Sequence, residues 1–127
     1  MNSDELKRRT KAFALRIIRL VESLPPGTVA NIIGRQLGKS GTSVGANYRA
    51  ACRAKSQADF IAKMGIVEEE ADESIYWMEL SMESGLMQVE RIKDLKDEAG
   101  QLVAIFVSSI NTALGNKRDS NKRDEDQ

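Results

Sequence analysis

The residues best suited to chemistry are lysines and arginines that recur one helical turn apart in the first half of the chain. Eight of them form four pairs: Lys7 and Lys11, Arg16 and Arg19, Arg35 and Lys39, and Arg49 and Arg53. Spacings of three and four residues bring side chains to the same face of a helix. Cations clustered on one face bind nucleic-acid phosphates, because each neutralised phosphate releases counterions. These residues are the candidate nucleic-acid site, and no base-reading motif accompanies them, so binding would be independent of sequence.

The net charge of the chain is zero, but the charge is unevenly distributed. Residues 1–55 contain eleven basic and three acidic residues, a net charge of +8, whereas residues 56–115 contain four basic and twelve acidic residues, a net charge of −8. Such an asymmetry concerns partners rather than the fold. Two interpretations stay open. The basic half binds nucleic acid, or it pairs with an acidic half in the same chain or, head to tail, in a neighbouring subunit.

An acidic run at 68–73, with Glu79 and Glu83 beyond it, raises the question of metal chemistry. Di-metal sites in helical bundles use Glu-x-x-His pairs, and the chain contains no histidine. The lack of histidine also removes the usual general base and the Ser-His and Cys-His nucleophiles. We therefore expect no enzyme activity, no metal and no cofactor. An all-carboxylate magnesium or calcium site is the alternative to a solvated or subunit-facing acidic surface.

The stretch 38–51, GKSGTSVGANYRAA, has the glycines, lysine and serine of a phosphate-binding loop. Such a loop requires a further glycine at position 33, which is isoleucine, and a preceding strand. The glycines recur instead at helical spacing, as Gly34, Gly38, Gly41 and Gly45. Each glycine inside a helix costs about 1 kcal/mol relative to alanine. Close approach of another helix, from the same bundle or from another subunit, would compensate for this cost.

Hydrophobic periodicity predicts the elements that carry these residues. Apolar and small residues recur every three or four positions over 6–24, 30–54, 60–78 and 86–113. The sequences PPG at 25–27 and ESG at 83–85 separate these stripes. The pattern predicts an all-α fold, an antiparallel up-and-down four-helix bundle. The longest apolar run, LVAIFV at 102–107, is too short to span a bilayer, so we expect no membrane association.

The expected helix ends define the domain boundaries. Ser3, Thr28 and Ser56 are candidate N-caps, and Gly115 occupies a position typical of a C-terminal cap. The bundle is therefore predicted to comprise residues 1–115. Residues 116–127 contain no apolar side chain and are predicted to be a charged, disordered tail.

Three further residues are candidates for contacts between helices or subunits. Asn47 falls on a core-facing stripe, where we expect a buried polar group that fixes register and partner. Tyr76 and Trp77 are adjacent and point to different faces; one is expected in the core and the other at a subunit contact. The single cysteine, Cys52, is expected to be half-buried and allows no disulfide within the chain, so the cytoplasm is the expected location.

Residues 40–80, SGTSVGANYRAACRAKSQADFIAKMGIVEEEADESIYWMEL, closely resemble the four-helix-bundle protein family. This family includes proteins encoded in intervening sequences of bacterial large-subunit ribosomal RNA genes. The accessory variability determinant of diversity-generating retroelements is a more distant relative. The resemblance implies a bundle assembled into a ring-shaped homopentamer, but no agreed activity.

The sequence therefore leaves two classes of function open. The first is a non-enzymatic oligomer that binds RNA or DNA through its basic helices, with a nucleic-acid enzyme as a further partner that the retroelement relative implies. The second is a purely structural or protein-interaction oligomer without a nucleic-acid ligand.

Overall fold

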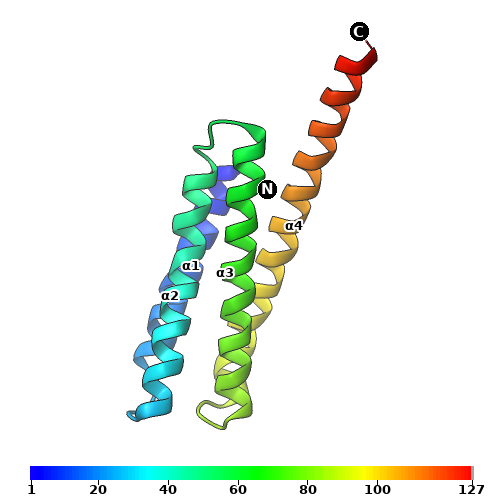
Figure 1. The fold of residues 1–127 in the computed structure, drawn as a ribbon. Coiled ribbons are helices and arrows are strands. Elements are labelled where there is room, and N and C mark those ends of the chain that lie inside the picture. The colour runs from blue at the N-terminus through cyan, green and yellow to red at the C-terminus, as the bar shows by residue number, and fades with distance from the viewer. Residues whose placement is uncertain (127) are drawn as a thin grey trace.

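The computed structural model describes the backbone of residues 1–126 and the side chains of residues 1–116 and 122. Within this part of the chain the fold consists of four helices: α1 (Ser3–Glu22), α2 (Thr28–Ala51), α3 (Gln57–Glu83) and α4 (Val89–Asp126). Consecutive helices run in opposite directions and pack side by side (Figure 1). This arrangement confirms the predicted all-α, up-and-down four-helix bundle. No helix of the described part combines the length and apolar character needed to cross a membrane.

Local capping determines where the helices begin. The Ser56 hydroxyl accepts a hydrogen bond from the Asp59 N–H at 3.0 Å, so its predicted role as N-cap of α3 is confirmed. The predicted caps of α1 and α2 are wrong by one residue. Asn2 caps α1, because its side-chain oxygen accepts from the Glu5 N–H at 2.8 Å. Gly27, with a φ of 146° that disfavours any side chain, precedes α2 and offers no side-chain bond.

The predicted hydrophobic stripes form the core, with one displacement in α2. Phe13 and Ile17 of α1, Leu37 and Val44 of α2, and Met64, Val67 and Met78 of α3 are almost completely buried, together with Leu102 and Phe106 of α4. Beyond Val44 the buried residue is Tyr48 rather than the predicted Asn47. From Val44, a step of four residues turns the side chain by about 40° and a step of three by about 60° in the opposite direction, and the core lies on the side of Tyr48.

The core contains one hydrogen bond between two buried hydroxyl groups. Ser40 of α2 and Ser74 of α3 are 1% and 0% exposed, and their hydroxyl oxygens lie 2.9 Å apart. The Ser74 hydroxyl also lies 2.9 Å from the Glu70 carbonyl, and the Ser40 hydroxyl lies 3.3 Å from the Leu37 carbonyl. Both hydroxyls are therefore satisfied, so the pair links α2 to α3 without an unpaired polar group.

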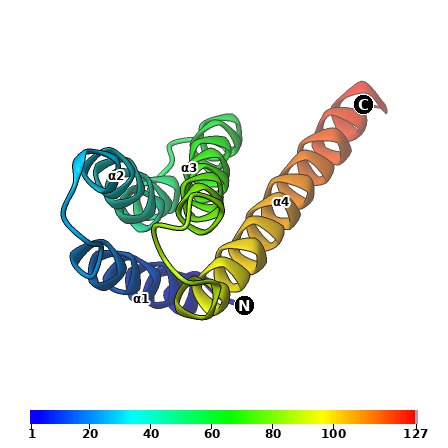
Figure 2. The same ribbon diagram turned by 90° about the horizontal axis from the view of Figure 1, so that it is seen from below.

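Helix α4 is longer than predicted and leaves the bundle towards its C-terminus. The view in Figure 2 shows its C-terminal part diverging from the other three helices. Gly115 does not end the helix, which continues to Asp126, so the predicted cap is wrong. One interior glycine costs only about 1 kcal/mol, which is too little to stop a helix by itself. The backbone of residues 116–126 is helical, and Gln127 lies outside the described residues. The expected disorder of the tail stays a prediction.

Candidate nucleic-acid interface

Four cationic side chains surround a groove of about 490 Å³ between α1 and α2. Lys7, Arg8 and Lys11 come from α1, and Arg49 comes from α2. Small residues form the remaining lining: Ala14 on α1, and Thr42, Gly45 and Ala46 on α2. The cations thus flank a lining that is uncharged and has little side-chain bulk. We call this feature the α1–α2 groove.

The antiparallel pairing of the first two helices brings these cations together. The first turns of α1 lie beside the last turns of α2, so Lys7 and Lys11 are close to Arg49 although about 40 residues separate them in sequence. Arg49 lies in the last turn of α2, where a positive charge interacts favourably with the helix dipole. Arg8 was not among the predicted site residues. Its spacing of three from Lys11 is the signal that could have identified it.

The α1–α2 groove carries net positive charge because no carboxylate lines it. Lys7 is half-buried, and Arg8, Lys11 and Arg49 are exposed. Within the described side chains, the ion pairs involve other residues, so the four groove cations keep their charge available for an external anion. Such a cluster attracts a polyanion by long-range electrostatics as well as by contact.

The other five predicted basic residues lie elsewhere. Arg16 and Arg19 line a separate recess together with Arg91 of α4. Arg35 lies beside the turn that contains Pro25 and Pro26. Lys39 faces α3 closely enough to oppose the upward pKa shift of Glu70, and Arg53 is exposed just beyond α2. The structure therefore brings Lys7, Lys11 and Arg49 together at the α1–α2 groove, and the other five predicted residues lie outside this groove.

The four glycines of α2 face α1 within the same chain. A Cβ atom added at Gly41 would lie 2.6 Å from Cγ1 of Ile17, and one at Gly45 would lie 3.2 Å from the Thr10 hydroxyl. At Gly34 the nearest atom would be Cδ1 of Leu24, at 3.2 Å. Gly38 has more room, with 4.0 Å to Val21. The helices α1 and α2 therefore approach most closely at Gly41, where even a methyl group does not fit.

The remaining predicted contact residues have different surroundings. Asn47 is half-buried rather than buried as expected, and its amide donates to the Ser43 carbonyl of its own helix at 2.8 Å. Tyr76 is 53% exposed, whereas Trp77 is half-buried against the core. Their rings pack edge to face with centroids 5.0 Å apart. A contact of Asn47, Tyr76 or Trp77 with another subunit stays a prediction.

The acidic residues of α3 do not converge on a common point. Within the described residues, no group of three or more histidine, cysteine or acidic side chains is close enough to hold a metal ion. Burial, followed by the charge of Glu73, raises the pKa of the Glu70 carboxyl above its ordinary value, while Lys39 acts in the opposite direction. The acidic run therefore forms a helix surface rather than a chelating cluster.

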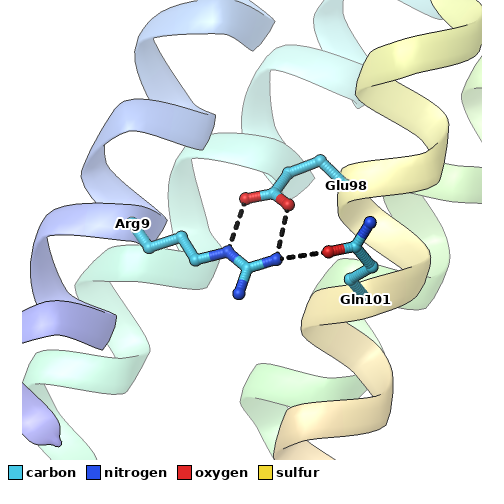
Figure 3. A network of polar contacts seen from close by, with 3 residues as sticks. All are labelled: Arg9, Glu98 and Gln101. Carbon is cyan, nitrogen blue, oxygen red and sulfur yellow. Dashed lines mark hydrogen bonds and ion pairs between the residues drawn. The ribbon is translucent and has the colours of Figure 1, made fainter. Parts of the chain in front are cut away.

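An ion pair that the sequence analysis did not identify joins α1 to α4 (Figure 3). The Arg9 guanidinium donates to both carboxylate oxygens of Glu98, at 2.8 and 2.7 Å, and to the side-chain oxygen of Gln101 at 2.8 Å. The hydrogen bond from Arg9 to Glu98 is the main reason why the pKa of Arg9 is raised. Because 89 residues separate Arg9 from Glu98, no local spacing could have revealed the pair.

The only cysteine lies beside a buried aromatic residue. Cys52 is half-buried, as expected. Tyr48 stacks on Phe106 with ring centroids 6.2 Å apart. Burial, followed by a hydrogen bond with Cys52, raises the pKa of the Tyr48 hydroxyl well above its ordinary value. Tyr48 is therefore a neutral core residue that links α2 to α4.

Comparison with known proteins places these features in context. A family model described as 23S rRNA-intervening sequence protein matches residues 4–108. The chain is also similar to a crystal structure of a Bacteroides thetaiotaomicron protein, described as having unknown function and as coming from the S23 ribosomal protein family. The two chains are 32% identical, the match covers 82% of this chain and 96% of the other, and the TM-score is 0.74. No curated protein matches the chain. The match to the family model includes both helices of the α1–α2 groove.

Proposed function

The chain belongs to the 23S rRNA-intervening sequence protein family, and from this premise we propose that it is a non-enzymatic protein that binds the phosphate backbone of nucleic acid. The observation that carries the proposal is the α1–α2 groove, with Lys7, Arg8, Lys11 and Arg49 around a lining free of carboxylates. Cations of this kind contact phosphates and provide no means of reading bases. Binding is therefore expected to be independent of sequence.

RNA is the preferred nucleic acid in this proposal. The family description refers to 23S ribosomal RNA, and the similar Bacteroides protein is assigned to a ribosomal protein family. Neither description names an enzymatic activity. We place the protein in the cytoplasm, and a nucleic-acid enzyme is a further partner in this proposal.

Self-association forms part of the proposal. Several large apolar side chains are exposed on a single chain: Leu15 and Ile18 on α1, Val29 and Ile32 on α2, and Ile66 and Tyr76 on α3. Together with the +8 and −8 halves of the chain, they favour a head-to-tail contact between subunits, which either closes into a ring or continues as a filament. The family resemblance implies the ring, with five subunits. A ring would repeat the α1–α2 groove and raise a weak affinity by multivalency.

Fluorescence anisotropy with a labelled, unstructured RNA at low salt tests the binding. If all four groove cations neutralise phosphates, log K should fall against log salt with a slope of about −3 for a single strand. Lys11→Glu should weaken binding about tenfold or more for every RNA sequence, because it removes one phosphate contact and adds repulsion.

Lys93→Glu is the matched control, because Lys93 is also exposed but lies on α4 and does not line the groove. If Lys11→Glu and Lys93→Glu weaken RNA binding equally, the affinity depends on the net charge of the protein and not on the groove. No complex with RNA or DNA at low salt would exclude nucleic-acid binding.

The second candidate is a purely structural oligomer, which the exposed apolar residues and the charge asymmetry favour by themselves. In that case the groove cations would pair with the acidic α3 of a neighbouring subunit. Lys11→Glu would then change the sedimentation of the protein in the absence of nucleic acid. In the binding proposal the groove cations stay outside the subunit contact, so the same substitution should leave sedimentation unchanged.

A further inference from the structure

A second cationic feature lies between α1 and α4. Arg16 and Arg19 of α1 and Arg91 of α4 line a recess of about 260 Å³, together with Leu20, Ser23 and Leu95. The two leucines are buried and the three arginines are exposed, so guanidinium groups surround an apolar base. We call this recess the arginine pocket.

The arginine pocket is separate from the α1–α2 groove. Lys7 and Arg16 are nine residues apart on α1, which is about two and a half helical turns, so they point to opposite sides of the helix. Arg16, Leu20 and Ser23, at spacings of four and three, share the side that faces α4. Arg91 and Leu95 come from the first turns of α4 with the same spacing of four. One anionic group therefore cannot contact both features.

The lining of the arginine pocket consists only of cationic, apolar and hydroxyl side chains. No carboxylate lines it, and the ion pairs within the described side chains do not involve its three arginines. The Ser23 hydroxyl already donates to the Leu20 carbonyl at 2.7 Å, so the three guanidinium groups are the donors left for a ligand. Guanidinium forks match the paired oxygens of phosphate groups and bind them with two parallel hydrogen bonds.

The size and charge of the pocket narrow the class of ligand. Pockets for whole small molecules typically occupy about 300–1,000 Å³, so a recess of about 260 Å³ fits a phosphate group better than an entire nucleotide. A phosphomonoester carries about −1.5 to −2 charges near neutral pH and three acceptor oxygens. A phosphodiester inside a strand carries one charge and has two terminal oxygens. Three arginines that line one recess match the charge and the acceptor count of the monoester.

We propose that the arginine pocket binds a terminal phosphomonoester, carried by the end of a nucleic-acid strand or by a mononucleotide. The strand-end source rests on the proposed function, since the strand would also occupy the α1–α2 groove. The mononucleotide source does not depend on it. Both sources present the same group to Arg16, Arg19 and Arg91.

The first experiment tests the pocket without any nucleic acid. Inorganic phosphate is titrated at pH 7.5 into the isotope-labelled protein, and backbone amide shifts are followed by NMR. Shifts should be largest around Ser23 and Leu95. Arg91→Gln should raise the apparent Kd about fivefold or more, because it removes one of three charged donors. Lys93→Gln, two residues away on α4, is the matched control and should leave the Kd unchanged. Absent shifts, or shifts spread evenly over all basic regions, would overturn the proposal.

The second experiment distinguishes the two sources. Anisotropy is measured with an oligonucleotide of one sequence that bears either a 5′-phosphate or a 5′-hydroxyl, and a nucleoside monophosphate serves as competitor. A preference of about threefold or more for the phosphorylated strand, lost in Arg91→Gln, supports the strand end.

Competition by the monophosphate at the pocket, with no preference between the two strands, supports the mononucleotide. If neither strand binds but the phosphate titration succeeds, the proposed function fails and the pocket stands. If the phosphate titration fails while both strands bind equally, the pocket is excluded and the proposed function stands.

Discussion

Helix α1 packs against α2 and α4 in two contrasting ways. Its contact with α2 is steric: Ile17 fills the space that a side chain at Gly41 would need. Its contact with α4 is the smallest of the helix–helix contacts and includes the charged network of Arg9, Glu98 and Gln101. The comparison shows that one helix can approach one neighbour closely along its length and contact another over a much smaller surface. The first contact is sensitive to volume and the second to charge.

The largest expected effect comes from adding volume at the α1–α2 contact. Gly41→Ala should destabilise the protein by about 1–3 kcal/mol, because the new methyl group would lie 2.6 Å from Ile17, which is fully buried and β-branched. Gly41→Leu should cost more and could prevent folding. Chemical denaturation followed by circular dichroism measures both. If Gly41→Leu unfolds and sediments as the wild type does, the close approach of α1 and α2 is not required.

The next effect concerns the charged contact between α1 and α4. The side chains of Arg9 and Glu98 are only 25% and 18% exposed, and their geometry is bidentate. A double-mutant cycle with Arg9→Gln and Glu98→Gln should therefore give a coupling energy of about 1 kcal/mol. The pair of Lys63 and Asp59, four residues apart on α3 and more accessible to solvent, serves as the reference and should give a smaller coupling energy. Equal coupling energies would show that the α1–α4 pair is no stronger than a surface pair.

Gly100 of α4 offers the opposite case to Gly41, a glycine whose replacement should stabilise the protein. An added Cβ at Gly100, which is exposed on α4, would meet nothing within 4 Å. Gly100→Ala should therefore stabilise the protein by up to about 1 kcal/mol, because alanine has the higher helix propensity. The same substitution at Gly41 has the opposite sign. If both glycine-to-alanine variants stabilise the protein, helix propensity rather than packing controls these positions.

The smallest effect concerns pH and the contact of α2 with α3. Because the folded-state pKa of Glu70 is raised, chiefly by burial, the folded protein binds this proton more tightly than the unfolded chain does. The Glu70 contribution to stability therefore increases as the pH falls through the raised pKa, and the charged form is unfavourable at pH 7. Glu70→Gln should raise Tm slightly at pH 7 and flatten the dependence of Tm on pH below neutrality. Asp72→Asn, at an exposed position of α3, is the control and should change the profile less.

Hydrophobic periodicity is sufficient to predict the helices and most of the core. The stripes through Phe13, Val44, Met64 and Phe106 are regular because a helix must bury one face continuously. The assignment of Asn47 to the core is wrong because a spacing of three and a spacing of four are both possible after Val44. Only the packing of Tyr48 on Phe106 decides between them.

The candidate site is less predictable than the core. Local spacing groups Lys7 with Lys11 and Arg16 with Arg19, but it does not say which neighbouring helix each pair faces. To predict that Arg91 joins Arg16 and Arg19, or that Arg9 pairs with Glu98, one must know the position of α4 relative to α1. Such relationships depend on crossing geometry, which the periodicity of a single helix does not contain.

The order of the interfaces along the chain has a consequence for folding kinetics. Apart from the small contact of α1 with α4, the interfaces join helices that follow each other in sequence, so most contacts are local and contact order is low. The pairing of Arg9 with Glu98 instead closes a loop of 89 residues, an entropic cost that disfavours its early formation. We therefore expect φ-values near zero for Arg9 and Glu98, so that breaking the pair accelerates unfolding and leaves the folding rate almost unchanged.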